Sequence, residues 1–403
     1  MIDQKLKFYT FASLFLVLVI DSMGIGLVFP LLGPLFISKT SALVPAAMSL
    51  GSRDLLYGIT LAIFCVFMFL GAPFFGDLSD HIGRKKVLLI CLFCTAGGLA
   101  LSAIGIIIKS LSFLIIGRVV AGFASGSQAL AEAAIVDIST EATKAVNLAL
   151  ISFASCLGFA IGPIISGYLA SEKISHLYGF STPFWVAAFL ALLNGVMLIF
   201  TFKETFHPGF VQKLHLTRGV EIFISAFTNK RIRKLAIIYL MAEFGWALFF
   251  QVIPLYVMKT YDYSTVQIGH VMALMGVVFG ISCLFIIRVV MKFFSTKQIA
   301  FYSIIITGVG MLAMLFNVEW VMWALFVPVS MGGALFYVVL LTLFSDSVGD
   351  NSQGWVMGVF AAIVAVSWSL SGVLSGVLSA INFYIPFIFA SICLLISAVL
   401  VRI

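Results

Sequence analysis

Long apolar stretches, separated by short polar connections, run through almost the whole chain. A run of 18 or more apolar residues predicts a membrane-crossing helix, since about 20 helical residues span the hydrocarbon core. Only 10% of the 403 residues are charged, whereas about 25% are charged in a typical soluble domain. The chain is therefore predicted to be an all-α integral membrane protein.

Twelve apolar stretches are long enough to cross the membrane, and we predict a transmembrane helix at each. They cover residues 9–36, 55–77, 87–108, 111–134, 145–170, 183–202, 234–258, 266–287, 297–316, 320–344, 353–380 and 382–401.

Lysine and arginine are distributed unevenly over the connections between these spans. With the N-terminus placed inside, the inner segments carry 17 Lys and Arg residues and the outer segments carry five. Cytoplasmic loops of membrane proteins carry such an excess of positive charge. We therefore predict a multi-pass protein of a bacterial-type plasma membrane with both termini in the cytoplasm. Topology accounts for the basicity, so no nucleic-acid partner is expected.

A basic polar stretch separates the sixth predicted span from the seventh. We predict an N-terminal six-helix bundle over 1–202, a cytoplasmic linker over 203–233 and a C-terminal six-helix bundle over 234–403. An internal repeat supports this division, because an offset of 209 residues places Asp137 on Asp346. Two six-helix units with the same membrane orientation are the layout of one large class of transporters.

The connection "GDLSDHIGRKK", residues 76–86, is unusually charged for its position between two apolar spans. It fits the signature loop of the major facilitator superfamily, and the chain resembles the twelve-helix drug/proton antiporters of the tetracycline-efflux type. The fit is carried by Gly76, Asp80, Gly83, Arg84 and Lys85. His81 stands where the family has Arg or Lys, and the second-half counterpart "RVVMKFFSTKQ" lacks the glycine and aspartate.

Three further motifs extend the resemblance over essentially the whole chain. They are "DSMGIGLVFPLLGPL" from Asp21, "GRVVAGFASG" through Arg118, Gly122 and Gly126, and "GFAIGPIISG" through Gly158, Gly162, Pro163 and Gly167. The resemblance implies two bundles related by a pseudo-twofold axis, and glycines near Pro163 that let the fifth span bend where the halves meet. We expect a monomer that handles a small molecule and protons, without a cofactor or metal.

The resemblance also implies a role for the charged loop. Asp80 would act near the eleventh span, and Arg84 would reach Asp137 at the end of the fourth. We hypothesise that these three residues latch the halves in the outward-open state and separate for inward opening. The alternative is that the loop cations only hold this connection in the cytosol, which does not account for Asp80, Gly76 and Gly83.

Ionisable residues within the predicted spans are costly and point to function. Asp21 and Glu243 lie near the middle of the first and seventh spans, which correspond in the repeat. We predict that they face each other across a central cavity and exchange protons; the alternative is a structural carboxylate bonded to neighbouring hydroxyls. His270, in the outer part of the eighth span, is interpreted mainly as a packed residue.

Arg118 and Glu132 are 14 residues apart on the fourth span. On one straight helix they would project to the same side, about 21 Å apart along the axis. The resemblance links Arg118 to proton coupling, while Glu132 either lines the inner vestibule or is structural. Other cavity residues are expected among aromatic and amide side chains of the seventh and tenth spans. They are Gln251, Trp246, Phe250, Phe336 and Tyr337, with packing between helices as the alternative.

No GxSxG, HExxH or P-loop motif occurs, which argues against a membrane enzyme and against an ATP-driven pump. The leading hypothesis is proton-coupled export of a small amphipathic compound by alternating access. The first alternative is proton-coupled uptake of a nutrient or metal chelate such as a siderophore. A second is a sensor that has lost transport.

Overall fold

The computed structural model describes most of the chain. The described residues are 2–37, 43–139, 141–171, 174–175, 178–204, 215, 217–349 and 352–402. Some cations used in the topology prediction lie outside this part. They are Lys39, Lys173 and Lys213, together with the side chains of Lys5, Lys7 and Lys144.

The described residues form helices and connections only, and twelve helical segments are long and apolar enough to cross a membrane. The first half contains α1 (Ile2–Gly26), α2 (Phe29–Ile37), α3 (Leu50–Ile82), α4 (Arg84–Ile107), α5 (Leu111–Ala124), α6 (Ser127–Asp137), α7 (Glu141–Leu169) and α8 (Thr182–Thr201). The second contains α10 (Arg233–Tyr261), α11 (Thr265–Ile281), η1 (Ser282–Ile286), α12 (Ile287–Val290), α13 (Thr296–Ala313), η2 (Met314–Phe316), α14 (Glu319–Asp346), α15 (Gln353–Ile381) and α16 (Ile385–Arg402). The twelve predicted spans are confirmed, with shifted ends.

Three spans are interrupted within their length. A turn at Leu27 and Val28 divides the first into α1 and α2, just before Pro30, which has no backbone N–H to donate. A turn at Ser125 and Gly126 divides the fourth into α5 and α6. The eighth contains the π-helical turn η1. Such interruptions place backbone and side chains where an unbroken helix could not.

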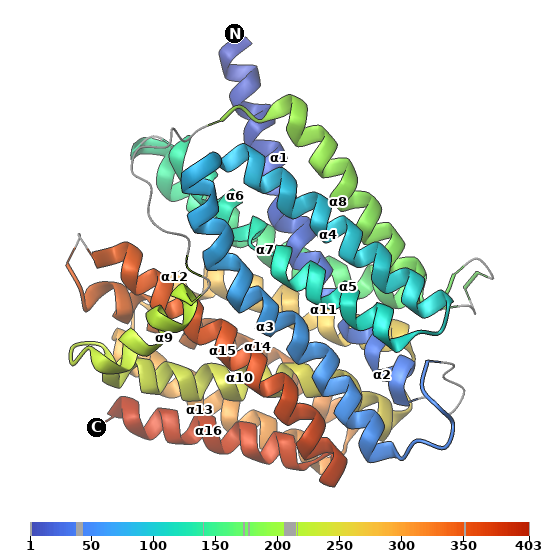
Figure 1. The fold of residues 1–403 in the computed structure, drawn as a ribbon. Helices are drawn as coiled ribbons and strands as arrows, with labels where there is room; N and C mark the ends of the chain where they lie inside the picture. The colour runs from blue at the N-terminus through green and yellow to red at the C-terminus, as the bar shows by residue number, and fades with distance from the viewer. Residues whose placement is uncertain are drawn as a thin grey trace.

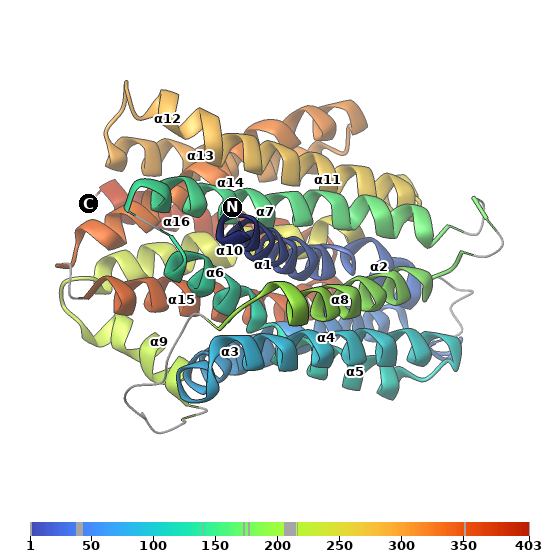
Figure 2. The ribbon, with the colours of Figure 1, turned by 90° about the horizontal axis from the view of Figure 1, so that it is seen from above.

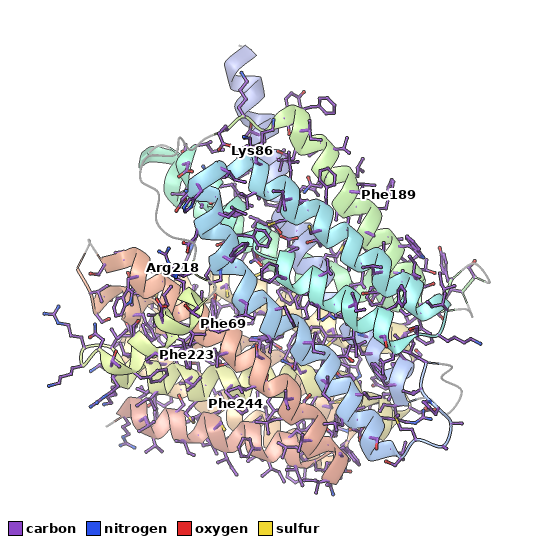
Figure 3. All side chains as sticks on the ribbon, in the orientation of Figure 1. Phe69, Lys86, Phe189, Arg218, Phe223 and Phe244 are labelled. Carbon is purple, nitrogen blue, oxygen red and sulfur yellow. The ribbon has the colours of Figure 1, made fainter. Side chains whose placement is uncertain are left out.

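The helices form two bundles that lie side by side (Figures 1 and 2). The broadest contacts between them are those of α3 with α15 and of α7 with α11. We call the end that carries residues 76–86 and Arg402 the basic end, and the end that carries Ser49 and Lys109 the opposite end. Helices of the two halves diverge toward the basic end (Figure 1). Apolar side chains such as Phe189, which is 62% exposed, point outward as a lipid-facing surface requires (Figure 3).

The two halves approach most closely toward the opposite end. A Cβ on Gly58 of α3 would lie 2.5 Å from the carbonyl oxygen of Gly372 on α15, so only glycine fits between these backbones. The buried carboxylate of Asp54 on α3 accepts two hydrogen bonds of 2.7 Å from Lys259 Nζ on α10. Small residues and a half-buried ion pair therefore join the halves here.

The predicted linker contains a helix that sequence reasoning did not identify, α9 (Arg218–Thr228). At its first residue, Arg218 pairs with Asp77 of α3. Farther along, Ser225 Oγ accepts a 3.0 Å hydrogen bond from Trp355 Nε1 of α15. α9 thus contacts both halves at the basic end, in the angle between them (Figures 1 and 3).

Candidate functional site

The charged loop is organised around Gly83 and Glu204. Gly83 has a φ of +95°, a backbone conformation that is open to glycine alone, and any side chain on it would collide with the Glu204 carboxylate. Glu204 accepts hydrogen bonds from the backbone N–H groups of Arg84 (2.9 Å) and Lys85 (3.1 Å). A carboxylate at the N-terminus of α4 satisfies donors that the helix itself leaves free. Glu204 was not among the predicted residues.

Arg84 and Asp137 meet as the resemblance implied, with 2.6 Å between Nε and Oδ2. This ion pair joins α4 to α6, so it lies wholly within the first half and is intact while the opposite end is packed. Asp80 is exposed and makes no hydrogen bond or ion pair with any described residue. Of Asp80, Arg84 and Asp137, only Asp80 is thus without a bonding partner among the described residues. A Cβ on Gly76, one turn before Asp80, would meet no atom within 4 Å.

Asp21 is buried between the first and fourth spans. Ser127, at the start of α6, donates a 2.6 Å hydrogen bond from Oγ to Asp21 Oδ2. The turn at Gly126 makes this possible, because it restarts the helix at Ser127 beside α1. Serine was not identified as a partner from the sequence.

Glu243 is buried in the second half, with 3% of its surface exposed. Its Oε1 atom accepts a 2.9 Å hydrogen bond from Trp368 Nε1 on α15. Its Oε2 atom has no hydrogen-bond partner within the described chain. Each acid is thus bonded within its own half, so in this conformation Asp21 and Glu243 belong to separate networks rather than to one shared site.

Arg118 is buried over the ring of Phe64 on α3, with 4.3 Å between Cζ and the ring centroid. Its Nε and Nη1 atoms have no hydrogen-bond partner among the described residues. Glu132 instead faces Gln128, whose side-chain nitrogen also approaches Ser155 of α7. The sequence argument treated the fourth span as one straight helix, whereas the turn at 125–126 divides it between Arg118 and Glu132. That both side chains project to the same side therefore stays a prediction.

The predicted aromatic residues do gather in the second half. Trp246 lies 6.1 Å from Phe250 and 6.5 Å from Phe336, measured between ring centroids. Tyr337 joins the group through Phe279, at 6.1 Å. These rings pack against one another in this conformation.

Two surface hollows lie away from the buried acids. The first lies between α13 and α16 and the second among α3, α4 and α5. Neither is lined by Asp21 or Glu243.

The glycine motif of α7 divides between two neighbours. Gly158 and Gly162 lie against α1 of the same half, while Gly167 lies against Thr265 of α11. Thr265 Oγ1 donates to the Gly167 carbonyl at 3.0 Å. α7 runs as one helix through Pro163, which packs against Gly269 of α11. His270 lies 3.2 Å from the Tyr168 hydroxyl, so it also lies where the halves meet.

The chain is similar to curated drug-resistance proteins over most of its length. The class C tetracycline resistance protein of Escherichia coli is 26% identical, over 88% of this chain and 85% of its own. The quinolone resistance protein NorA of Staphylococcus aureus is also 26% identical, over the same shares.

Solved structures share the fold at lower identity. A D-xylose-proton symporter superposes with a TM-score of 0.74 at 16% identity, covering 97% of each chain. The human organic anion transporter MFSD10 (TETRAN) has a TM-score of 0.72 at 18% identity, covering 98% of this chain and 99% of its own. Finally, the family description "Major Facilitator Superfamily" matches residues 14–301 and 235–403. The chain therefore belongs to the major facilitator superfamily, whose members are membrane transporters and not enzymes.

Proposed function

We propose that this transporter exports a small amphipathic compound in exchange for protons. The observation that carries the proposal is the pair of buried acids, Asp21 and Glu243, on the corresponding spans of the two halves. Ionisable residues inside a membrane protein mark proton relays and ion pathways. A buried carboxylate oxygen that accepts no hydrogen bond from the described residues, such as Oε2 of Glu243, is a place where a transported proton can bind.

The proton cycle would operate by alternating access. The two units, residues 1–202 and 234–403, would rock about the buried acids, each of which loses its proton when water on one side reaches it. We assign the basic end to the cytoplasm from its excess of Lys and Arg. With the opposite end packed, this would be an inward-facing conformation, in which Asp80 has no partner among the described residues and could pair with the second half in the other conformation.

The direction of transport rests on the relatives. The similar proteins are named for tetracycline and quinolone resistance, which favours export. The fold leaves direction and substrate open, since a D-xylose-proton symporter shares it. Uptake of a nutrient or chelate is therefore the alternative that a transport assay has to distinguish.

The test is transport by the purified protein in proteoliposomes with an imposed pH gradient. Tetracyclines and fluoroquinolones are the first compounds to screen. Glu243→Gln and Asp21→Asn keep the size of each side chain and remove the titratable group. We expect both variants to lose accumulation against a gradient, because no proton can be exchanged.

The control is Glu221→Gln, which changes an exposed carboxylate on α9 outside the spans and should transport normally. Full accumulation by both acid variants would contradict the coupling assignment. Substrate that moves together with protons, in the same direction, would establish uptake instead.

A further inference from the structure

We propose that Trp368 is a positioning residue that couples the protonation of Glu243 to the packing of the two halves. The inference rests on the proposed function, since it takes Glu243 as the site of the transported proton. It concerns a residue on α15, the helix that makes the broadest contact with the first half through α3.

The indole of Trp368 is tied directly to the acid. Nε1 donates to Glu243 Oε1 at 2.9 Å. A hydrogen bond to an ionised acceptor is roughly twice as strong as one between neutral groups. The bond therefore weakens when Glu243 takes up a proton, and the indole is then held less firmly toward α10.

The same side chain faces the first half. The Trp368 ring lies 6.3 Å from the ring of Phe29 on α2, at an interplanar angle of 62°. It also packs against the small cluster formed by Phe64, Cys65 and Ala121. Arg118 also lies over the ring of Phe64, so Trp368 and the buried arginine of the first half contact the same cluster.

A second set of bonds runs through the backbone of Trp368. Gln251, two turns beyond Glu243 on α10, donates from Nε2 to the Trp368 carbonyl at 3.0 Å. The backbone carbonyl of Gln251 accepts a 2.6 Å hydrogen bond from the buried hydroxyl of Tyr57 on α3. A shift of Trp368 thus reaches α3 both through ring contacts and through Gln251.

The titratable groups nearest to Glu243 are two phenols, Tyr239 one turn earlier on α10 and Tyr337 on α14. Tyr337 also lies near Glu132 of the first half. Because Tyr239 shares the helix of Glu243, loss of its hydroxyl alters the acid's surroundings without cutting a link between helices.

The test follows the opposite end as a function of pH in the full-length protein. A Cβ on Gly51 would lie 3.4 Å from the Cβ of Ala380, close to the separation found in disulfides. Oxidation of the double variant Gly51→Cys, Ala380→Cys therefore reports how often the halves are packed there. We expect the disulfide yield to change with pH in this background.

Trp368→Phe keeps a ring and removes the indole N–H. We expect it to flatten the pH dependence of the disulfide yield, as Glu243→Gln should. Tyr239→Phe is the matched control, because it removes a polar group beside the same carboxyl; it should keep the full pH response, even if its midpoint moves. This contrast is the readout that a merely structural role for Trp368 would not produce.

The outcomes separate the two ideas. If Glu243→Gln flattens the response and Trp368→Phe behaves like Tyr239→Phe, the role of Trp368 is overturned and the proposed function stands. A full response in Glu243→Gln would overturn the role of Glu243 and, with it, that of Trp368. If Trp368→Phe does not fold, Phe29→Leu tests the same step, since it keeps the indole N–H but removes the ring contact; an unchanged response would then refute the proposal.

Discussion

The two glycines of the charged loop, Gly76 and Gly83, differ in how strictly the structure requires glycine, although both belong to the same family motif. Gly83 has a positive φ and the Glu204 carboxylate where a side chain would be, whereas Gly76 has open space around it. The Glu204 carboxylate accepts hydrogen bonds from the two backbone N–H groups at the start of α4. One glycine of the motif is therefore needed for folding of the loop, and the other is not strained in this conformation.

We expect Gly83→Ala to destabilise the protein by about 1–3 kcal/mol, the usual cost of a non-glycine residue in such a backbone conformation. Displacement of Glu204 should add to the loss. Thermal unfolding in detergent measures the effect, with Gly76→Ala as the matched control, which should unfold like the wild type. Equal melting temperatures for the two variants would contradict this account of the loop.

At the scale of helices, the opposite end is held by close backbone packing and by one ion pair across the halves. α3 meets α15 at Gly58 and Gly372, and Asp54 meets Lys259. In the alternating-access cycle proposed above, these contacts have to separate when the opposite end opens. A disulfide between positions 51 and 380 would prevent that separation.

We expect the disulfide formed by Gly51→Cys and Ala380→Cys to stop transport, because it fixes α3 to α15. Transport in proteoliposomes should cease on oxidation and return on reduction. The single variants Gly51→Cys and Ala380→Cys, which carry the same native cysteines, should remain active under both conditions. Undiminished transport with the disulfide fully formed would show that this end does not have to open.

For the whole molecule, an even number of spans places both termini at one end, and charge decides which end that is. We expect the basic end to face the cytoplasm, since it carries most of the Lys and Arg residues. The two exposed positions Lys86 and Lys109 lie at the basic and opposite ends respectively.

A membrane-impermeant maleimide should therefore label Lys109→Cys in intact cells and Lys86→Cys only after the cells are opened. The parent protein controls for the native cysteines, all of which lie within spans. Labelling of Lys86→Cys in intact cells would reverse the predicted orientation.

The twelve spans and the family could be established from the sequence, and the duplication stays a prediction. They depend on local composition and on short motifs, and the physical cause is the cost of placing polar groups in hydrocarbon, which acts on every stretch independently. The same reasoning identified Asp21, Glu243 and Arg118, because a charged residue within an apolar span can be recognised without knowing how that span packs.

The partners of the buried acids and of the charged loop depended on the tertiary structure. Ser127, Trp368 and Glu204 are common polar or aromatic residues that no motif singles out. They lie 106, 125 and 120 positions from the groups they bond. The turn at 125–126, which places Ser127 beside α1, was not predicted from the sequence. Sequence alone thus determined which segments enter the membrane and which of them carry charge. Packing between distant helices decided what each charge meets, because contacts of that kind arise only when the bundles assemble.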